Sequence, residues 1–177
     1  MADVKKRTTK DCLALICGDV DIRIAADGVW FHDGRPILRK KLVQLFASVL
    51  RRESNGEYWL ITPAEQARIK VEEAPFIVVE MIVTRENENQ NIVLRTNIDQ
   101  YITVDSDHPV YVSKRPNGEY APYLRISNGL TALINRSVYY QMAELCMERV
   151  SAIGSQTGIW SQGSFFSLFE SSPLVST

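Results

Sequence analysis

The stretch ILRKKLVQLFASVL, residues 37–50, has the pattern of an amphipathic helix and determines the fold that we expect. Its apolar side chains recur at the 3.6-residue period of a helix with one face on a core. A second stretch, INRSVYYQMAELCM at residues 134–147, repeats the Ile-x-Arg start and the apolar register 97 positions later. Strand-like sequence precedes each stretch. The pattern therefore predicts a duplicated unit of strands and one helix, with a site at the interface between the two copies.

Two observations bear on the strength of this repeat. Any two amphipathic helices share apolar spacing, because the helical period imposes it, so only the common Ile and Arg favour duplication. A second repeated sequence, Asn-Gly-Glu-Tyr, occurs at residues 55–58 and again at 117–120, at a different offset of 62 positions. Two hairpins that use the same turn chemistry explain this second repeat, and we favour that interpretation over duplication.

Most of the remaining chain has the alternation or the apolar character of strands separated by turns. Thr62, followed by Pro63 and Glu65, resembles a helix-capping sequence and predicts a single helical turn. The main helices are expected at 38–52 and 135–153. Because strands cluster rather than alternate with helices, the order predicts an α+β fold of antiparallel sheets. The expected strands are 21–25, 29–31, 57–61, 68–71, 76–83, 92–95, 101–104, 110–112 and 120–126.

These elements divide the chain into four expected parts. Residues 1–14 form a flexible terminus, 15–80 an N-terminal α+β unit, 81–153 a C-terminal α+β unit, and 154–177 a tail. The apolar segment Phe165–Phe169 either docks on the core or remains mobile.

Composition excludes several classes of protein. The chain has 177 residues, of which 45% are apolar and 23% charged, as in a globular domain that buries a core. A net charge of −1 leaves no basic surface for a nucleic acid polymer or an anionic membrane. The run Cys12–Cys17 is too short for a signal peptide or a membrane span. Three cysteines without zinc spacing indicate a reducing, cytoplasmic compartment.

No catalytic or cofactor-binding motif is present. The sequence lacks glycine-rich phosphate loops, a nucleophile elbow and a His-Glu-x-x-His helix, so we expect no cofactor and no metal centre. His32 and His108 are the two histidines and the plausible general bases of any enzyme. His32 is expected to stack or hydrogen bond in the core beside Trp30. His108, before Pro109, is expected to have a role in a turn. Catalysis is therefore less expected than binding.

Arg39 and Arg136 each lie in the first turn of an expected helix. The helix dipole disfavours a cation there by about 0.3–1 kcal/mol, so periodicity does not explain these positions. Free backbone N–H groups together with a guanidinium would form an anion site. The alternative is that each arginine turns away to a carboxylate, such as Asp33 or Glu144.

Six motifs follow one another in a specific order over residues 20–147. They are Asp27-Gly28-x-Trp30-x-His32-x-Gly34-x-Pro36-Ile37-x-Arg39, Tyr58-x-Leu60-x-Thr62-Pro63, Leu94-Arg95-Thr96-Asn97, His108-Pro109, Pro122-Tyr123-Leu124, and Leu130-x-Ala132-x-Ile134-x-Arg136-x-Val138-Tyr139-Tyr140. Their joint order resembles the bacterial family named domain of unknown function 1285. The resemblance implies two related α+β units, the C-terminal one similar to pleckstrin-homology-like domains. It also implies a nucleotide-like ligand at their interface and a role in signalling.

We favour a sensing module that binds a small anionic, nucleotide-like molecule between the two units. The alternative is a protein-interaction domain that uses an exposed sheet edge or the apolar pair Phe165-Phe166. An enzyme is the third reading. The candidate ligand-binding residues are Trp30, His32, Arg39, Thr62, Arg95, Thr96, Asn97, His108, Tyr123, Arg136 and Tyr139.

Overall fold

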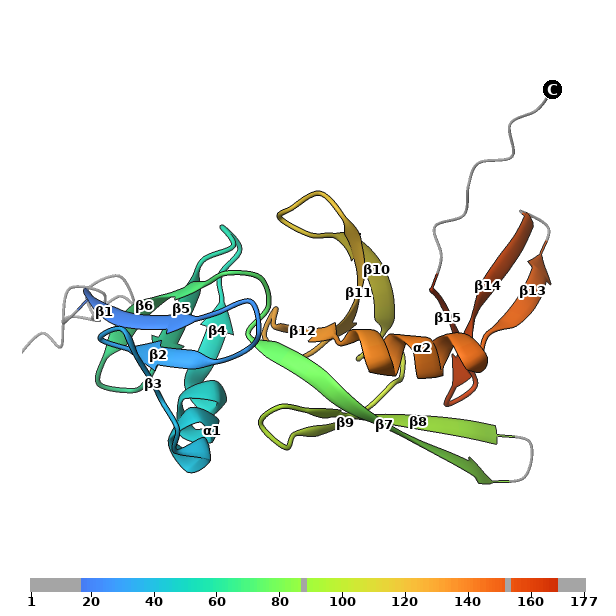
Figure 1. Ribbon diagram of the computed structural model, residues 1–177, viewed down its shortest axis with the longest axis horizontal. Helices are drawn as coiled ribbons and strands as arrows, with labels where there is room; N and C mark the ends of the chain where they lie inside the picture. Colours follow the sequence, from blue (N-terminus) through green and yellow to red (C-terminus); the bar gives the residue numbers. More distant parts are fainter. Residues whose placement is uncertain (1–16, 87–88, 152–153, 169–177) are drawn as a thin grey trace, which may run out of the picture.

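The computed structural model describes residues 17–86, 89–151 and 154–168 (Figure 1). Two six-stranded sheets lie side by side, and a three-stranded sheet follows near the carboxyl end. The first sheet contains β1 (Cys17–Ile24), β2 (Trp30–His32), β3 (Arg35–Pro36), β4 (Leu50–Arg52), β5 (Tyr58–Ile61) and β6 (Gln66–Val71), with α1 (Lys40–Val49) between β3 and β4.

The second unit has the same number of strands but a different helix position. Helix α2 follows its last strand and leads into the third sheet. The elements are β7 (Phe76–Glu86), β8 (Asn89–Thr96), β9 (Tyr101–Thr103), β10 (Val110–Lys114), β11 (Tyr120–Arg125), β12 (Thr131–Ile134), α2 (Arg136–Glu144), β13 (Met147–Ser151), β14 (Gly154–Ser161) and β15 (Ser164–Ser167).

The two large sheets share one topology. Their strand orders are β3-β2-β1-β6-β5-β4 and β9-β8-β7-β12-β11-β10, so each strand of the first unit has an equivalent six positions later. Each unit is a pair of three-stranded antiparallel meanders joined by one parallel pair, β1 with β6 and β7 with β12. The prediction of two related units is confirmed. The prediction of purely antiparallel sheets is wrong, because the first and last strands of each unit run in the same direction.

The repeated Asn-Gly-Glu-Tyr sequences, not the helices, mark equivalent positions. Helix α1 joins the third and fourth strands of its unit, whereas α2 follows the sixth. Asn55 and Asn117 both lie in the hairpin between the fourth and fifth strands. In each hairpin the asparagine Oδ1 accepts a hydrogen bond from the glutamate N–H two residues later, at 3.0 and 3.1 Å. The prediction of two hairpins with the same turn chemistry is confirmed, and our preference for that explanation over duplication is corrected, because the hairpins occupy equivalent positions in the two units.

Both helices are shorter than predicted. Helix α1 ends at Val49, and the next three residues pair with β5 as β4. Helix α2 ends at Glu144, and residues 147–151, which were expected to be helical, pair with β14 as an edge strand. A strand partner that is distant along the chain overrides the local helical pattern at both ends.

The expected C-terminal tail is structured as far as Leu168. Residues 154–168 form β14 and β15, and Phe166 and Leu168 are buried in the same hydrophobic cluster as Trp30 and Met142. The last residue of the predicted docking segment, Phe169, lies outside the described residues. One core therefore extends through both units and the third sheet.

The two units join in the short segment 72–75, between β6 and β7. Strand β7 belongs entirely to the second sheet, so this junction precedes the expected boundary at residue 80. The likeness of the C-terminal unit to pleckstrin-homology-like domains stays a prediction.

Candidate functional site

A groove of about 340 Å³ opens where the β4–β5 hairpin of the first unit faces β10 and β11 of the second. We call it the tyrosine groove. Its lining combines three aromatic rings with cationic side chains from both units. The lining residues are Arg52, Tyr58, Glu73, Tyr111, Ser113, Lys114, Arg115, Pro116, Tyr123 and Thr131.

Strand pairing places these side chains. Arg52 lies directly opposite Tyr58 across the β4–β5 ladder, and its guanidinium lies 5.4 Å from the centre of the Tyr58 ring. Tyr111 lies directly opposite Tyr123 across the β10–β11 ladder, and their rings stack at 6.0 Å. Directly opposed residues in an antiparallel pair point to the same face, so each ladder presents a pair of side chains to the groove.

Glu73 forms a buried polar network at the base of the groove. Its side chain is 5% exposed, and one carboxylate oxygen accepts a hydrogen bond from Arg115 Nη2 at 2.6 Å. The other oxygen accepts from the Tyr123 hydroxyl at 3.0 Å. A buried carboxylate is tolerated because both of its oxygens have partners. Arg115 Nε is buried and finds no partner among the described residues, so the guanidinium has unused donor capacity.

The tyrosines are neutral hydrogen-bond donors at physiological pH. Burial raises the pKa of Tyr58 and of Tyr111 above the ordinary value. Burial, followed by the hydrogen bond to Glu73, raises the pKa of Tyr123 to about 12. Within the described part of the chain, the Tyr58 and Tyr111 hydroxyls line the groove and have no hydrogen-bond partner, so both keep unused hydrogen-bonding capacity.

Positive charge predominates around the groove. Arg52, Lys114 and Arg115 line it, and the Arg125 guanidinium lies 5.9 Å from the Tyr111 ring. Glu73 is the acidic residue of the lining, and Arg115 already pairs with it. The arrangement suits an anionic group held by guanidinium and ammonium groups beside a flat, apolar body stacked on phenol rings.

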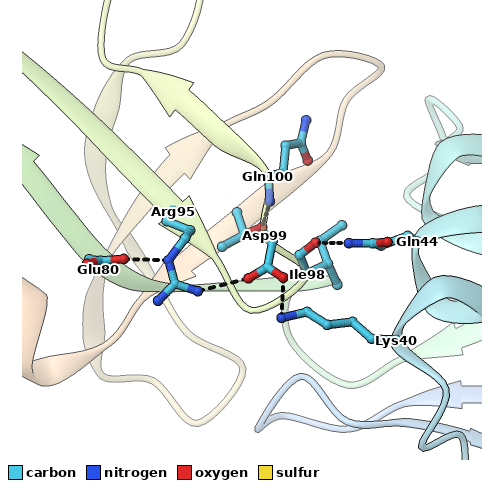
Figure 2. Close-up of polar contacts among 8 residues, drawn as sticks. Lys40, Gln44, Glu80, Arg95, Ile98, Asp99 and Gln100 are labelled. Atoms are coloured by element: carbon cyan, nitrogen blue, oxygen red, sulfur yellow. Dashed lines mark hydrogen bonds and ion pairs between the residues drawn. The ribbon is translucent and has the colours of Figure 1, made fainter.

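On another side of the interface, α1 contacts the turn between β8 and β9 through polar side chains (Figure 2). Asp99 accepts from Arg95 Nη1 at 2.9 Å and pairs with Lys40 at 2.5 Å, and Arg95 also binds Glu80. Gln44 Nε2 donates to the Ile98 carbonyl at 2.8 Å. The predicted ligand residue Arg95 therefore positions Asp99 within the second unit, and Asp99 makes the ion pair with Lys40 of the first unit.

Asn97 and Thr96, also predicted ligand residues, belong to this contact. Asn97 accepts from the Ile77 N–H and donates to the Gly28 carbonyl, both at 3.1 Å. Thr96 is fully buried and accepts from the Gln100 N–H at 3.2 Å. A Cβ atom at Gly28 would lie 2.7 Å from Asn97 Nδ2, so the close approach of the units requires glycine there. The Asn97 side chain therefore bridges the two units, whereas the hydrogen bond of Thr96 lies within the second unit. A role of either residue in ligand binding stays a prediction.

A second interface cavity, of about 370 Å³, lies beside this contact. Arg51 lines it while Arg52 lines the tyrosine groove, because successive strand residues point to opposite faces. Arg51 Nη1 donates to the carbonyls of Leu50 and Ser48, at 2.6 and 3.2 Å. Its charge is thus engaged in closing the end of α1, and this cavity suits an anion less well.

A larger hollow, of about 560 Å³, lies within the first unit over β1, β5 and β6. Its acidic and basic groups include Glu57 and Arg68, which pair with each other at 3.0 Å. It spans only one unit, so it lacks the two-sided arrangement of the tyrosine groove.

Four further predicted residues lie far from any shared site. Trp30 is 2% exposed and stacks on Phe46 at 6.2 Å, so a ligand cannot reach it. His32 is exposed, 3.8 Å from Asp33, so its predicted place in the core is wrong. Thr62 Oγ1 accepts a hydrogen bond from the Glu65 N–H at 3.0 Å, but the predicted helical turn does not form there. His108 lies in a turn, as predicted, and its Nδ1 lies 3.0 Å from Asp105 Oδ1.

The paired arginines do not form a common site. Arg39 is exposed at the start of α1 and has no partner among the described residues. Arg136 Nε donates to the Tyr140 hydroxyl at 2.8 Å, so neither arginine pairs with Asp33 or Glu144. Tyr139 is half-buried and packs on the core. Of the predicted residues, Tyr123 lines the tyrosine groove.

Sequence reasoning missed most of the groove, although one signal was available. Arg52 and Lys114 each stand three residues before a repeated Asn-Gly, and Tyr58 and Tyr120 each stand three residues after that asparagine. The repeated Asn-Gly-Glu-Tyr sequence, which we did not interpret as a duplication, thus marks the two hairpins that border the groove. Glu73, Tyr111 and Arg115 carried no comparable signal.

Over the described ranges, no cluster of His, Cys, Asp or Glu is suited to hold a metal ion. Among the helices of the same ranges, none is both long and apolar enough to cross a membrane.

The comparisons divide the chain close to the junction seen in the structure. Residues 14–74 match the N-terminal domain model, a domain of unknown function (DUF1285), and residues 75–168 match the C-terminal domain model of the same family. The chain belongs to the DUF1285 family. No curated protein matches it.

Two crystal structures of DUF1285 proteins are similar to this chain. The protein from Silicibacter pomeroyi DSS-3 is 37% identical, with 86% of this chain and 81% of that chain covered and a TM-score of 0.75. The protein from Shewanella baltica OS155 is 27% identical, with 71% and 91% covered and a TM-score of 0.57. These comparisons establish the family and the fold. Any inference about function therefore depends on the chemistry of the groove.

Proposed function

We propose that this DUF1285 protein is a sensing module that binds a small anionic, nucleotide-like ligand in the tyrosine groove. One observation carries the proposal: cations and neutral phenols from both units surround a single groove at their interface. Its volume of about 340 Å³ is within the range of about 300–1,000 Å³ found for small-molecule sites.

The two kinds of lining have separate roles. Arg52 and Lys114 bind the anionic group, Arg52 by a charge-assisted and potentially bidentate contact. The Tyr58 and Tyr111 rings stack against the planar part of the ligand, and their free hydroxyls donate hydrogen bonds to it. Arg115, fixed by Glu73, orients the second unit's side of the site.

A ligand that touches both units is the basis of the proposed sensing. Arg52 belongs to the first unit and Lys114 to the second, so occupancy stabilises one arrangement of the units over others. We propose that this sensing serves signalling in the cytoplasm.

The test is a thermal-shift and calorimetric comparison with nucleoside monophosphates and inorganic phosphate. At a hundred times Kd, a ligand adds about 2.7 kcal/mol to the free energy of unfolding. We expect a rise in Tm for the wild type, loss of that rise in Arg52→Gln and Lys114→Gln, and an unchanged rise in Arg39→Gln, the matched control on an exposed arginine outside the groove. No shift in the wild type, or a wild-type response in Arg52→Gln, would overturn the proposal.

A further inference from the structure

Helix α1 exposes an apolar stripe on its outer face. Leu38 is 88% exposed, Leu45 is 60% and Leu42 is 36%. Leu42 and Leu45 lie on one side of α1, and Leu38 lies two positions before Lys40, the first residue of the helix. The apolar period of residues 37–50 predicts that Leu42 and Leu45 face the core, and their exposure shows that this prediction is wrong. The helix instead packs through a second stripe, formed by residues 43, 46 and 50.

Unpaired positive charge accompanies this stripe. Arg39 and Lys41 are exposed at the amino end of α1, and neither side chain has a hydrogen bond or ion pair with any described residue. The adjacent Lys40 differs, because it pairs with Asp99 of the second unit. Helix α1 itself contains no acidic residue. We call Leu38, Arg39, Lys41, Leu42 and Leu45 the α1 face.

Contiguous exposed apolar side chains with polar surroundings mark interaction surfaces in soluble proteins. On α1, Leu42 and Leu45 lie three positions apart and form part of a ridge that fits the groove of a second helix. Cations beside the ridge gain free energy when they meet carboxylates across an interface, and they select against a basic partner. The α1 face therefore has both an attractive apolar component and a charge preference.

We propose that the α1 face is the docking surface for an acidic amphipathic helix of a partner protein. The partner helix carries apolar residues at i, i+3 or i+4, and i+7, with Asp or Glu beside them. The surface involves no residue of the tyrosine groove, so this proposal stands apart from the proposed ligand-binding function.

Charge disfavours three other occupants of this face: a second copy docked through the same face, residues 1–16 of the chain, and an anionic bilayer. A second copy would present another α1 face, which has no carboxylate for Arg39 and Lys41. Residues 1–16 of the chain hold four basic and two acidic residues, so their net charge has the wrong sign. An anionic bilayer is opposed by the net charge of −1 on the whole protein.

The test uses two fluorescein-labelled helical peptides and the full-length protein, followed by fluorescence anisotropy. The acidic peptide has leucines at i, i+4 and i+7 flanked by glutamates, and the basic peptide replaces those glutamates with lysines. We expect the acidic peptide to bind at least tenfold more tightly. Leu45→Glu should weaken its binding at least tenfold, and Arg39→Glu with Lys41→Glu should reverse the preference. Tyr140→Glu, at the 53% exposed Tyr140 of α2, is the matched control and should bind as the wild type does.

These variants lie on exposed positions, and circular dichroism with Tm measurement verifies that each one folds. Equal affinity for the two peptides, or wild-type binding by Leu45→Glu, would refute the proposal. Two other results would also refute it. One is sedimentation with phosphatidylserine vesicles that Leu45→Glu abolishes, and the other is a dimer, seen by light scattering, that Leu45→Glu dissociates.

Discussion

The two units of this protein share a strand order but place their helices differently. Helix α1 lies inside the strand sequence of its unit, between β3 and β4, packs with one stripe and exposes another. Helix α2 follows the last strand of its unit, buries Val138 and Met142, and turns polar residues outward. An apolar period shows that a helix is amphipathic, but when two stripes are apolar the neighbouring elements decide which one is buried.

The largest expected effect distinguishes the two helices by stability. Met142→Ala removes a fully buried side chain and should lower the free energy of unfolding by about 2–5 kcal/mol. Leu45→Ala, at an exposed position, should change it by no more than about 0.5 kcal/mol. Urea unfolding measures both. Equal losses would show that the outer stripe of α1 is packed in solution, which would remove the contrast.

The next effect tests whether the two hairpins are equivalent. Gly56 and Gly118 have φ of +89° and +90°, and a Cβ atom at either would lie 3.9 Å from a side-chain atom four residues earlier. Each change to alanine should therefore cost about 1–2 kcal/mol from backbone strain alone. Losses that differ by more than about 1 kcal/mol in urea unfolding would mean that the repeated turns no longer serve the same role.

The helix starts differ in a way that predicts changes of opposite sign. The Asn135 side chain accepts from the Val138 N–H at 2.8 Å, so Asn135→Ala should destabilise by about 1 kcal/mol. Arg39 occupies the same capping position of α1 without a side-chain bond. Arg39→Asn should therefore stabilise by about 0.5–1 kcal/mol, by adding a cap and removing a disfavoured cation. Thermal unfolding measures both, and destabilisation by Arg39→Asn would reveal a contact of Arg39 in solution.

The smallest effect concerns how α1 is attached to the second unit. Hydrogen bonds from Lys40 and then Arg95 lower the pKa of Asp99. A carboxyl group with a lowered folded-state pKa stabilises the protein above its unfolded pKa of about 4 and loses that contribution as pH falls. Between pH 5 and pH 2, Asp99→Asn should lose less stability than the wild type, as followed by urea midpoints. Parallel curves for the two proteins would show that this ion pair contributes nothing.

Local signals in the sequence determined much of the secondary structure. Asp27-Gly28 and Asn55-Gly56 predicted their turns, since few residues other than Gly and Asn adopt positive φ. Apolar alternation located most of the strands. These features depend on residues within a few positions of one another, so they can be predicted from the sequence without knowledge of the fold.

The tertiary structure alone decided the ends of both helices, the buried stripe of α1 and the tyrosine groove. Leu50 and Met147 leave a helical pattern because strands β5 and β14 supply ladder hydrogen bonds. The groove joins side chains from residue 52 to residue 131, which meet only when the two large sheets pack together. Periodicity specifies which face of an element is apolar, whereas the relative position of two sheets depends on contacts distributed over the whole chain.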